Sequence, residues 1–129
     1  MRLATVLGLL GGLLGPGCVT PSIPIPPPDV ALMTFDVSAV GSGSDAVTEA
    51  TFEYPANPSY VDSTVYVFDQ NRGDGVIETA SPTGGFLQTQ PFAATLGDQV
   101  IVTVQHDDQS ESACVVLQDG LQNPNVPCQ

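Results

Sequence analysis

The sequence predicts an all-β fold, a small β-sandwich of about seven strands. Three observations predict it: short runs alternate between apolar and polar residues, turn-forming residues separate these runs, and no stretch after residue 30 has the apolar repeat of a helix. A small β-barrel is the alternative arrangement of the same strands. The chain has 129 residues, so one domain is expected.

The strands are predicted in order from side-chain alternation. In the first, Met33, Phe35 and Val37 share one face, and polar residues occupy the other. The most apolar runs are 64–69 and 99–106, and the former is typical of a central strand. Turn chemistry separates the runs, as in the glycine-rich and proline-rich stretches 41–45, 54–58, 71–75 and 82–85. The predicted strands are 33–39, 48–54, 64–69, 76–80, 86–90, 99–106 and 112–118.

Part of the domain resembles a known family. The Gly85-Phe86 turn, the Leu96-Gly97-Asp98 turn, the Val/Thr-rich run 100–104 and the acidic turn Asp107-Asp108 are similar to those of bacterial immunoglobulin-like modules. The similarity covers residues 64–115. It implies an immunoglobulin-like sandwich that acts as a non-catalytic spacer or adhesive unit.

The first residues have the pattern of an export signal. Met1-Arg2 is a short positive region, and the uncharged apolar stretch 3–15 is too short to span a bilayer. A small residue then directly precedes Cys18, which resembles the lipobox of bacterial lipoproteins. The resemblance implies a signal peptide over residues 1–17 and a lipidated Cys18. An ordinary secretory leader cut near Cys18 is the alternative.

A proline-rich tether is expected over residues 18–29, before a β-sandwich domain over 30–129. Five of residues 19–29 are proline, which favours an extended polyproline II segment. The alternative is that this segment is a ligand for a domain that recognises proline-rich peptides. Val19, where an inner-membrane lipoprotein would carry Asp, favours the outer membrane by resemblance to that sorting pattern.

The chain has three cysteines. In an exported protein, where cysteines usually pair as disulfides, an odd number indicates that one cysteine has another role. If Cys18 carries lipid, Cys114 and Cys128 remain as a pair. An oxidising compartment favours a disulfide between them. Closing this loop would stabilise the fold by about 3 kcal/mol, and it would attach the loop-like tail that begins at Asp119 to the preceding strand. Free thiols acting as metal ligands are the alternative.

The charge balance excludes some partners. The chain has 14 acidic residues and only two basic ones, Arg2 and Arg72, for a net charge of −12. Nucleic acids and anionic lipid surfaces need a basic face, so charge-driven binding to either is excluded. The expected partners are the membrane, through the lipid, and a protein or glycan at the cell surface.

Three short patterns could carry chemistry. Asp69, Asn71 and Asp74 lie in a glycine-containing loop, and their oxygens are a candidate site for Ca²⁺ as a cofactor. Arg72-Gly73-Asp74 is the tripeptide that integrins read, although an acidic hairpin turn explains it as well. His106 beside Asp107-Asp108 could act as a base, but a strand-end surface histidine is the simpler interpretation.

No catalytic site is predicted, since no nucleophile or second histidine completes one. The tyrosines Tyr54, Tyr60 and Tyr66 could form a sugar-binding platform, but core packing or loop anchoring is the favoured role. The preferred hypothesis is a non-enzymatic envelope lipoprotein that binds or scaffolds through loops or a sheet edge. The alternatives are a Ca²⁺-dependent adhesive or carbohydrate-binding domain and, last, a small hydrolase.

Overall fold

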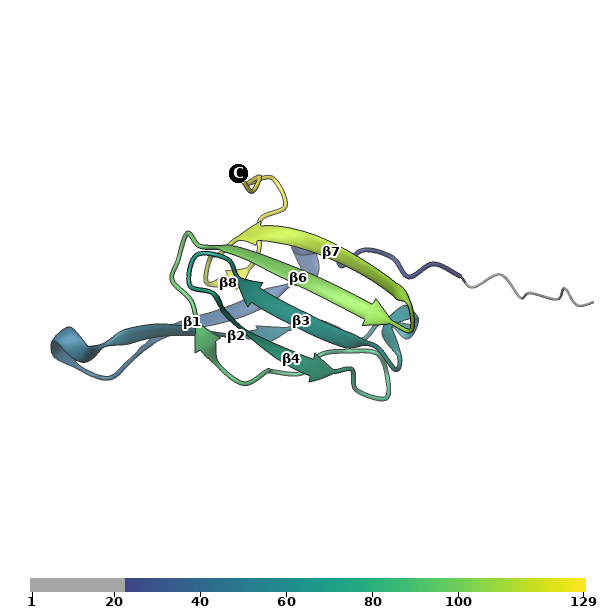
Figure 1. Cartoon of the computed structure of the whole chain (residues 1–129), viewed down its shortest axis with the longest axis horizontal. Coiled ribbons are helices and arrows are strands. Elements are labelled where there is room, and N and C mark those ends of the chain that lie inside the picture. Colours follow the sequence, from purple (N-terminus) through teal and green to yellow (C-terminus); the bar gives the residue numbers. More distant parts are fainter. Residues whose placement is uncertain (1–22) are drawn as a thin grey trace, which may run out of the picture.

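In the computed structural model, which describes residues 23–129, the chain forms two four-stranded antiparallel sheets that pack face to face (Figure 1). One sheet has the strand order β5-β2-β1-β8 and the other β4-β3-β6-β7. The chain changes sheet after β2, β4, β5 and β7, so both sheets share one core. The predicted all-β sandwich is confirmed.

The strands and the short 3-10 helices have the following bounds: β1 Thr34–Val40, β2 Val47–Glu53, β3 Thr64–Asp69, β4 Asp74–Thr79, β5 Phe92–Ala93, β6 Gln99–His106, β7 Gln109–Val116 and β8 Gly120–Leu121, with η1 Val30–Leu32, η2 Gly43–Asp45 and η3 Pro58–Tyr60. The helices among residues 23–129 are single turns, too short to cross a bilayer.

Side-chain alternation along the strands builds the core. β3 contributes Val65 and Val67, and β6 contributes Val100, Val102 and Val104, all of them buried. Aromatic rings fill the space between the sheets in one continuous series, with successive ring centroids 5.1–6.4 Å apart. The series is Phe92, Phe35, Phe52, Tyr54, Tyr60 and Phe86.

Two strand predictions need correction. Residues 86–90 were expected to form a strand, but they form only a bridge between Phe86 and Tyr54. The ladder stops there because the Thr89 hydroxyl, rather than a backbone carbonyl, accepts from the Phe52 N–H, and Pro91 has no N–H to donate. Regular pairing resumes only at β5.

The C-terminal tail also differs from the expected loop. Gly120 pairs with Phe35 and Leu121 with Thr34, so β8 is an edge strand beside β1. Asp119 fixes the approach, since its Oδ1 accepts from the Val37 N–H at 2.9 Å.

The folded domain begins before residue 30, where the tether was expected to end. Ile25 is buried in the core, and Pro28 is also buried. The sandwich therefore includes residues 25–29 of the proline-rich segment, because the side chain of Ile25 reaches the gap between the sheets. This segment enters at the end of the sandwich opposite the projecting β1–β2 hairpin (Figure 1).

Candidate functional site

A buried carboxyl group lies at the end of β3. Asp69 is fully buried, and its Oδ1 accepts from the N–H groups of Asn71 and Arg72, both at 2.9 Å. Its Oδ2 is buried and has no hydrogen-bond partner among the described residues. Burial, followed by the neighbouring Asp98 side chain, raises the pKa of Asp69 to about 6. Asp69 therefore orders the β3–β4 turn and carries a proton under mildly acidic conditions.

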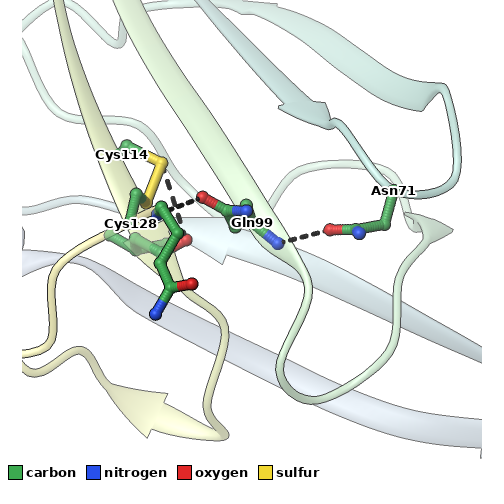
Figure 2. Close-up of a disulfide and its surroundings, with 6 residues drawn as sticks. Asn71, Gln99, Cys114 and Cys128 are labelled. Atoms are coloured by element: carbon green, nitrogen blue, oxygen red, sulfur yellow. Dashed lines mark hydrogen bonds between the residues drawn. A yellow bond between two sulfur atoms is a disulfide. The ribbon is translucent and has the colours of Figure 1, made fainter.

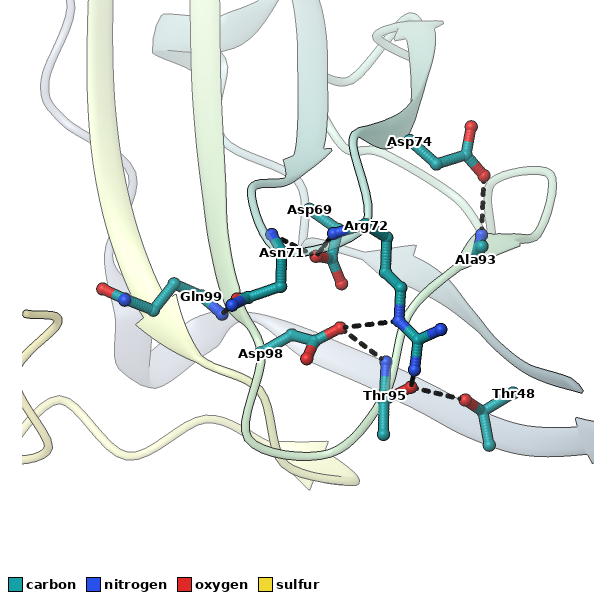
Figure 3. Close-up of polar contacts among 9 residues, drawn as sticks. All are labelled: Thr48, Asp69, Asn71, Arg72, Asp74, Ala93, Thr95, Asp98 and Gln99. Atoms are coloured by element: carbon teal, nitrogen blue, oxygen red, sulfur yellow. Dashed lines mark hydrogen bonds and ion pairs between the residues drawn. The ribbon is translucent and has the colours of Figure 1, made fainter.

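The side chain of Arg72 turns toward the β5–β6 loop (Figure 3). Its Nε lies 3.5 Å from Asp98 Oδ2, and its Nη2 hydrogen-bonds Thr95 Oγ1. Asp98 Oδ2 also accepts from the Thr95 N–H at 2.9 Å. Because Arg72 is the single Lys or Arg residue of the described part of the chain, this cluster joins the one permanent side-chain cation there to a nearly buried carboxylate.

The Arg-Gly-Asp tripeptide is thus built into the sandwich. Asp74 Oδ2 accepts from the Ala93 N–H at 2.7 Å, which links β4 to β5 of the opposite sheet. Arg72 is held by Asp98, as described above. Both charged side chains have partners within the domain, so the geometry favours the structural interpretation of this turn over presentation to a receptor.

The candidate calcium ligands do not converge. Asp69 Oδ1 accepts from the Asn71 N–H within the same turn. Asn71 Oδ1 accepts from the Gln99 N–H at 2.7 Å, and Asp74 Oδ2 accepts from the Ala93 N–H (Figure 3). Each oxygen thus points to a different backbone group. Among residues 23–129, no group of three or more His, Cys, Asp or Glu side chains is placed to hold a metal ion.

His106 lies at the opposite end of the sandwich, at the end of β6. It is half-buried, and its Nε2 is 3.4 Å from Asp107 Oδ2. Ser59 and Asp62 line the same open hollow of about 490 Å³, but no hydrogen bond joins either of them to His106. These three residues therefore do not form the nucleophile–base contact of a serine-type hydrolase.

The tyrosines divide into two kinds. Tyr54 and Tyr60 are buried, and both bind the N-terminal segment: the Tyr54 hydroxyl accepts from the Asp29 N–H at 2.9 Å, and the Tyr60 hydroxyl donates to Pro26 O at 2.8 Å. Their predicted role in core packing is confirmed. Burial, then the neighbouring Tyr54, raises the pKa of Tyr60. Tyr66 is instead exposed on β3.

A third contact completes this N-terminal anchor, which we define as the contacts of residues 25–29 with Tyr54, Tyr60 and Gln109. The Ile25 N–H donates to Gln109 Oε1 at 2.8 Å. Sequence reasoning missed the anchor because its partners lie far along the chain. The available signal was a large apolar residue within the proline run, since Ile25 is buried, although Ile23 beside it is exposed.

The predicted cysteine pair is joined. Cys114 on β7 and Cys128 in the tail form a disulfide with their Cα atoms 6.1 Å apart (Figure 2). The Gln129 N–H donates to Gln99 Oε1 at 2.7 Å, which adds a second link between the tail and the sheet. Cys18 and the predicted signal peptide over residues 1–17 lie outside the described residues.

A shallow apolar groove of about 470 Å³ lies beside η1. Its rim includes the exposed side chains of Leu32, Leu87 and Leu121, and Glu53 is its only charged residue. It offers apolar contact but no converging acid, base or nucleophile.

In comparisons with protein-family models, curated protein sequences and solved structures, the chain gives no significant match. The resemblances to lipoprotein signals and to immunoglobulin-like modules therefore remain predictions.

Proposed function

We propose that this chain is a non-enzymatic lipoprotein of the bacterial cell envelope whose sandwich is a binding or scaffolding module. Cys18 would carry diacylglyceryl and palmitate-type acyl groups, and the outer membrane is the proposed location. The observation that carries the proposal is the N-terminal anchor, which fastens residues 25–29 to the sandwich a short distance along the chain from the proposed lipid attachment point.

The anchor sets how far the domain stands from the lipid. With residues 25–29 fixed to the sandwich, only residues 19–24 separate Cys18 from the folded domain. In polyproline II geometry that segment would span about 20 Å. A firm attachment at one end of the sandwich suits a module held near a membrane surface in a defined orientation.

A membrane-association experiment tests this function. Wild type and Cys18→Ser are expressed in a bacterial host, labelled with a clickable palmitate analogue and separated on a sucrose gradient. We expect labelled wild type in the outer-membrane fraction, and unlabelled Cys18→Ser that is no longer processed to the lipidated form. Unlabelled wild type in the soluble fraction would reject lipid anchoring.

Calcium separates this function from its main competitor. A Ca²⁺-dependent adhesive or carbohydrate-binding domain would be stabilised by the ion, as any ligand stabilises the state that binds it. We expect millimolar CaCl2 to leave Tm unchanged, because the oxygens of Asp69, Asn71 and Asp74 already accept from separate N–H groups. A calcium-dependent rise in Tm that EDTA reverses would favour the competitor.

A further inference from the structure

The outer face of the β4-β3-β6-β7 sheet has an apolar centre. We call this surface the open face and define it by the outward residues of these four strands. Tyr66 and Phe68 project from β3, with Ile77 of β4 opposite Tyr66 and Ile101 of β6 opposite Phe68. Ile77 is 65% exposed, Phe68 46% and Tyr66 37%. These four adjacent apolar side chains form a contiguous patch rather than scattered exposure. The patch ends beside Cys114, the outward residue opposite Ile101, where the disulfide holds the C-terminal tail.

The outward side chains of the four strands carry no charge. The acidic residues of these strands lie opposite inward-facing partners. Asp74 pairs with Asp69, Glu78 with Val65 and Glu111 with Val104, so their side chains point to the inner side of the sheet or lie at the edges of the sheet. The outward positions around the apolar centre hold only uncharged residues, including Thr103 and Ser112, whose hydroxyls lie 2.7 Å apart.

The other sheet is the internal comparison. Its outer face carries Asp36, Glu49 and Glu53, as expected for a chain of net charge −12. Two copies of such a chain repel each other wherever carboxylates meet, and like charges brought together at an interface are costly. The open face is the sheet surface on which two copies can meet without opposing carboxylates.

We propose that the open face binds the open face of a second copy of this chain, in a two-fold symmetric dimer. Each apolar centre would cover the other, with Tyr66 and Thr103 near the two-fold axis. The uncharged hydroxyl and amide groups around the centre would form the polar rim of the interface.

The entry point of the N-terminal segment favours a second copy in the same membrane, an argument that rests on the proposed lipid anchoring. The strands of this sheet run along the long axis of the domain, and residues 25–29 enter at one end of that axis (Figure 1). A two-fold axis parallel to the strands would therefore direct both N-terminal segments toward one surface. At about 4.8 Å between strands and about 3.3 Å per residue, the face of β4, β3, β6 and β7 covers roughly 450 Å². That is less than the area of about 800 Å² per partner in a standard interface, so the dimer depends on concentration within the membrane.

Cysteine cross-linking in the full chain tests the dimer. Thr103→Cys places a thiol at the centre of the open face, and Thr51→Cys, a similarly half-buried threonine on the outer face of β2, is the matched control. Under mild oxidation in native membranes, we expect a species of twice the chain mass from Thr103→Cys only. Its yield should fall at least about tenfold when Ile77→Asp is added, because each dimer would then bury two carboxylates in an apolar interface without partners.

Val47→Asp is the control for that charge, since Val47 is 55% exposed on the outer face of the other sheet. Added to Thr103→Cys, it should leave the yield unchanged. Equal cross-linking of Thr103→Cys and Thr51→Cys, no cross-linking, or cross-linking to a different protein would overturn the proposal.

Palmitate labelling of the same samples separates this proposal from the proposed function. A labelled chain without cross-linking rejects the dimer and keeps the lipid anchor. An unlabelled chain that still cross-links through Thr103→Cys keeps the dimer and rejects the anchor.

Discussion

Replacing Asp69 with Asn should stabilise the domain at neutral pH. The introduced amide would keep an oxygen in place of Oδ1, which accepts from the Asn71 and Arg72 N–H groups. Its NH2 group would occupy the place of the buried Oδ2, which has no partner and lies beside Asp98. The substitution thus removes a buried negative charge while it keeps the turn and adds a donor toward a carboxylate.

The magnitude follows from the raised pKa. The pKa of Asp69 is about 6 in the folded domain, against its ordinary value of 3.8, and at about 1.4 kcal/mol per pKa unit this difference corresponds to about 3 kcal/mol. Protonation favours the folded state, so the contribution of Asp69 to stability is complete below about pH 4 and is lost as pH rises through 6. Asp69→Asn should therefore gain up to about 3 kcal/mol over wild type at pH 7.5 and almost nothing at pH 4.

Urea unfolding of wild type and variant between pH 4 and 7.5 measures this difference. Asp36→Asn is the control, because it removes the same charge from an exposed position on β1. We expect its stability relative to wild type to vary much less over this range. A destabilised Asp69→Asn at pH 7.5, or a difference from wild type that does not change with pH, would refute the role assigned to the buried carboxyl.

Three further substitutions have defined expected effects. Gly84→Ala should cost about 3 kcal/mol or more in urea unfolding, since Gly84 has φ +85° and an added Cβ would lie 1.9 Å from Asn57 O; an unchanged midpoint would contradict this. Replacing Cys114 and Cys128 together with Ser should cost about 3 kcal/mol, and reductant should then have no further effect. Tyr60→Phe should cost about 1 kcal/mol and speed amide exchange in the N-terminal anchor; unaltered exchange there would count against the anchor.

Strand prediction succeeded where one residue alternation persists over a full strand. β3 and β6 have the predicted bounds because valines alternate along them and face one core. β5 and β8 could not be predicted, since each pairs over only two residues and carries no periodic signal. Residues 86–90 have strand-like composition, but the Thr89 hydroxyl takes the place of a ladder bond.

The candidate sites divide in the same way. The disulfide followed from counting cysteines, which requires no three-dimensional information. The proline content of residues 19–29 indicated extended backbone, but it could not show that Ile25 is buried or that Gln109 binds its N–H. The sequence also left open whether Arg72 and Asp74 are structural or available to a receptor. Only the approach of β5 and of the β5–β6 loop shows that both side chains are engaged within the domain.

The intact mass of the non-reduced mature protein, purified from its native host, tests the proposed lipoprotein most directly. We expect a chain that begins at Cys18, carries diacylglyceryl and acyl groups, and lacks two hydrogens because Cys114 and Cys128 are joined. A mass without lipid, from a chain cut elsewhere, would contradict membrane anchoring and make the domain a secreted one.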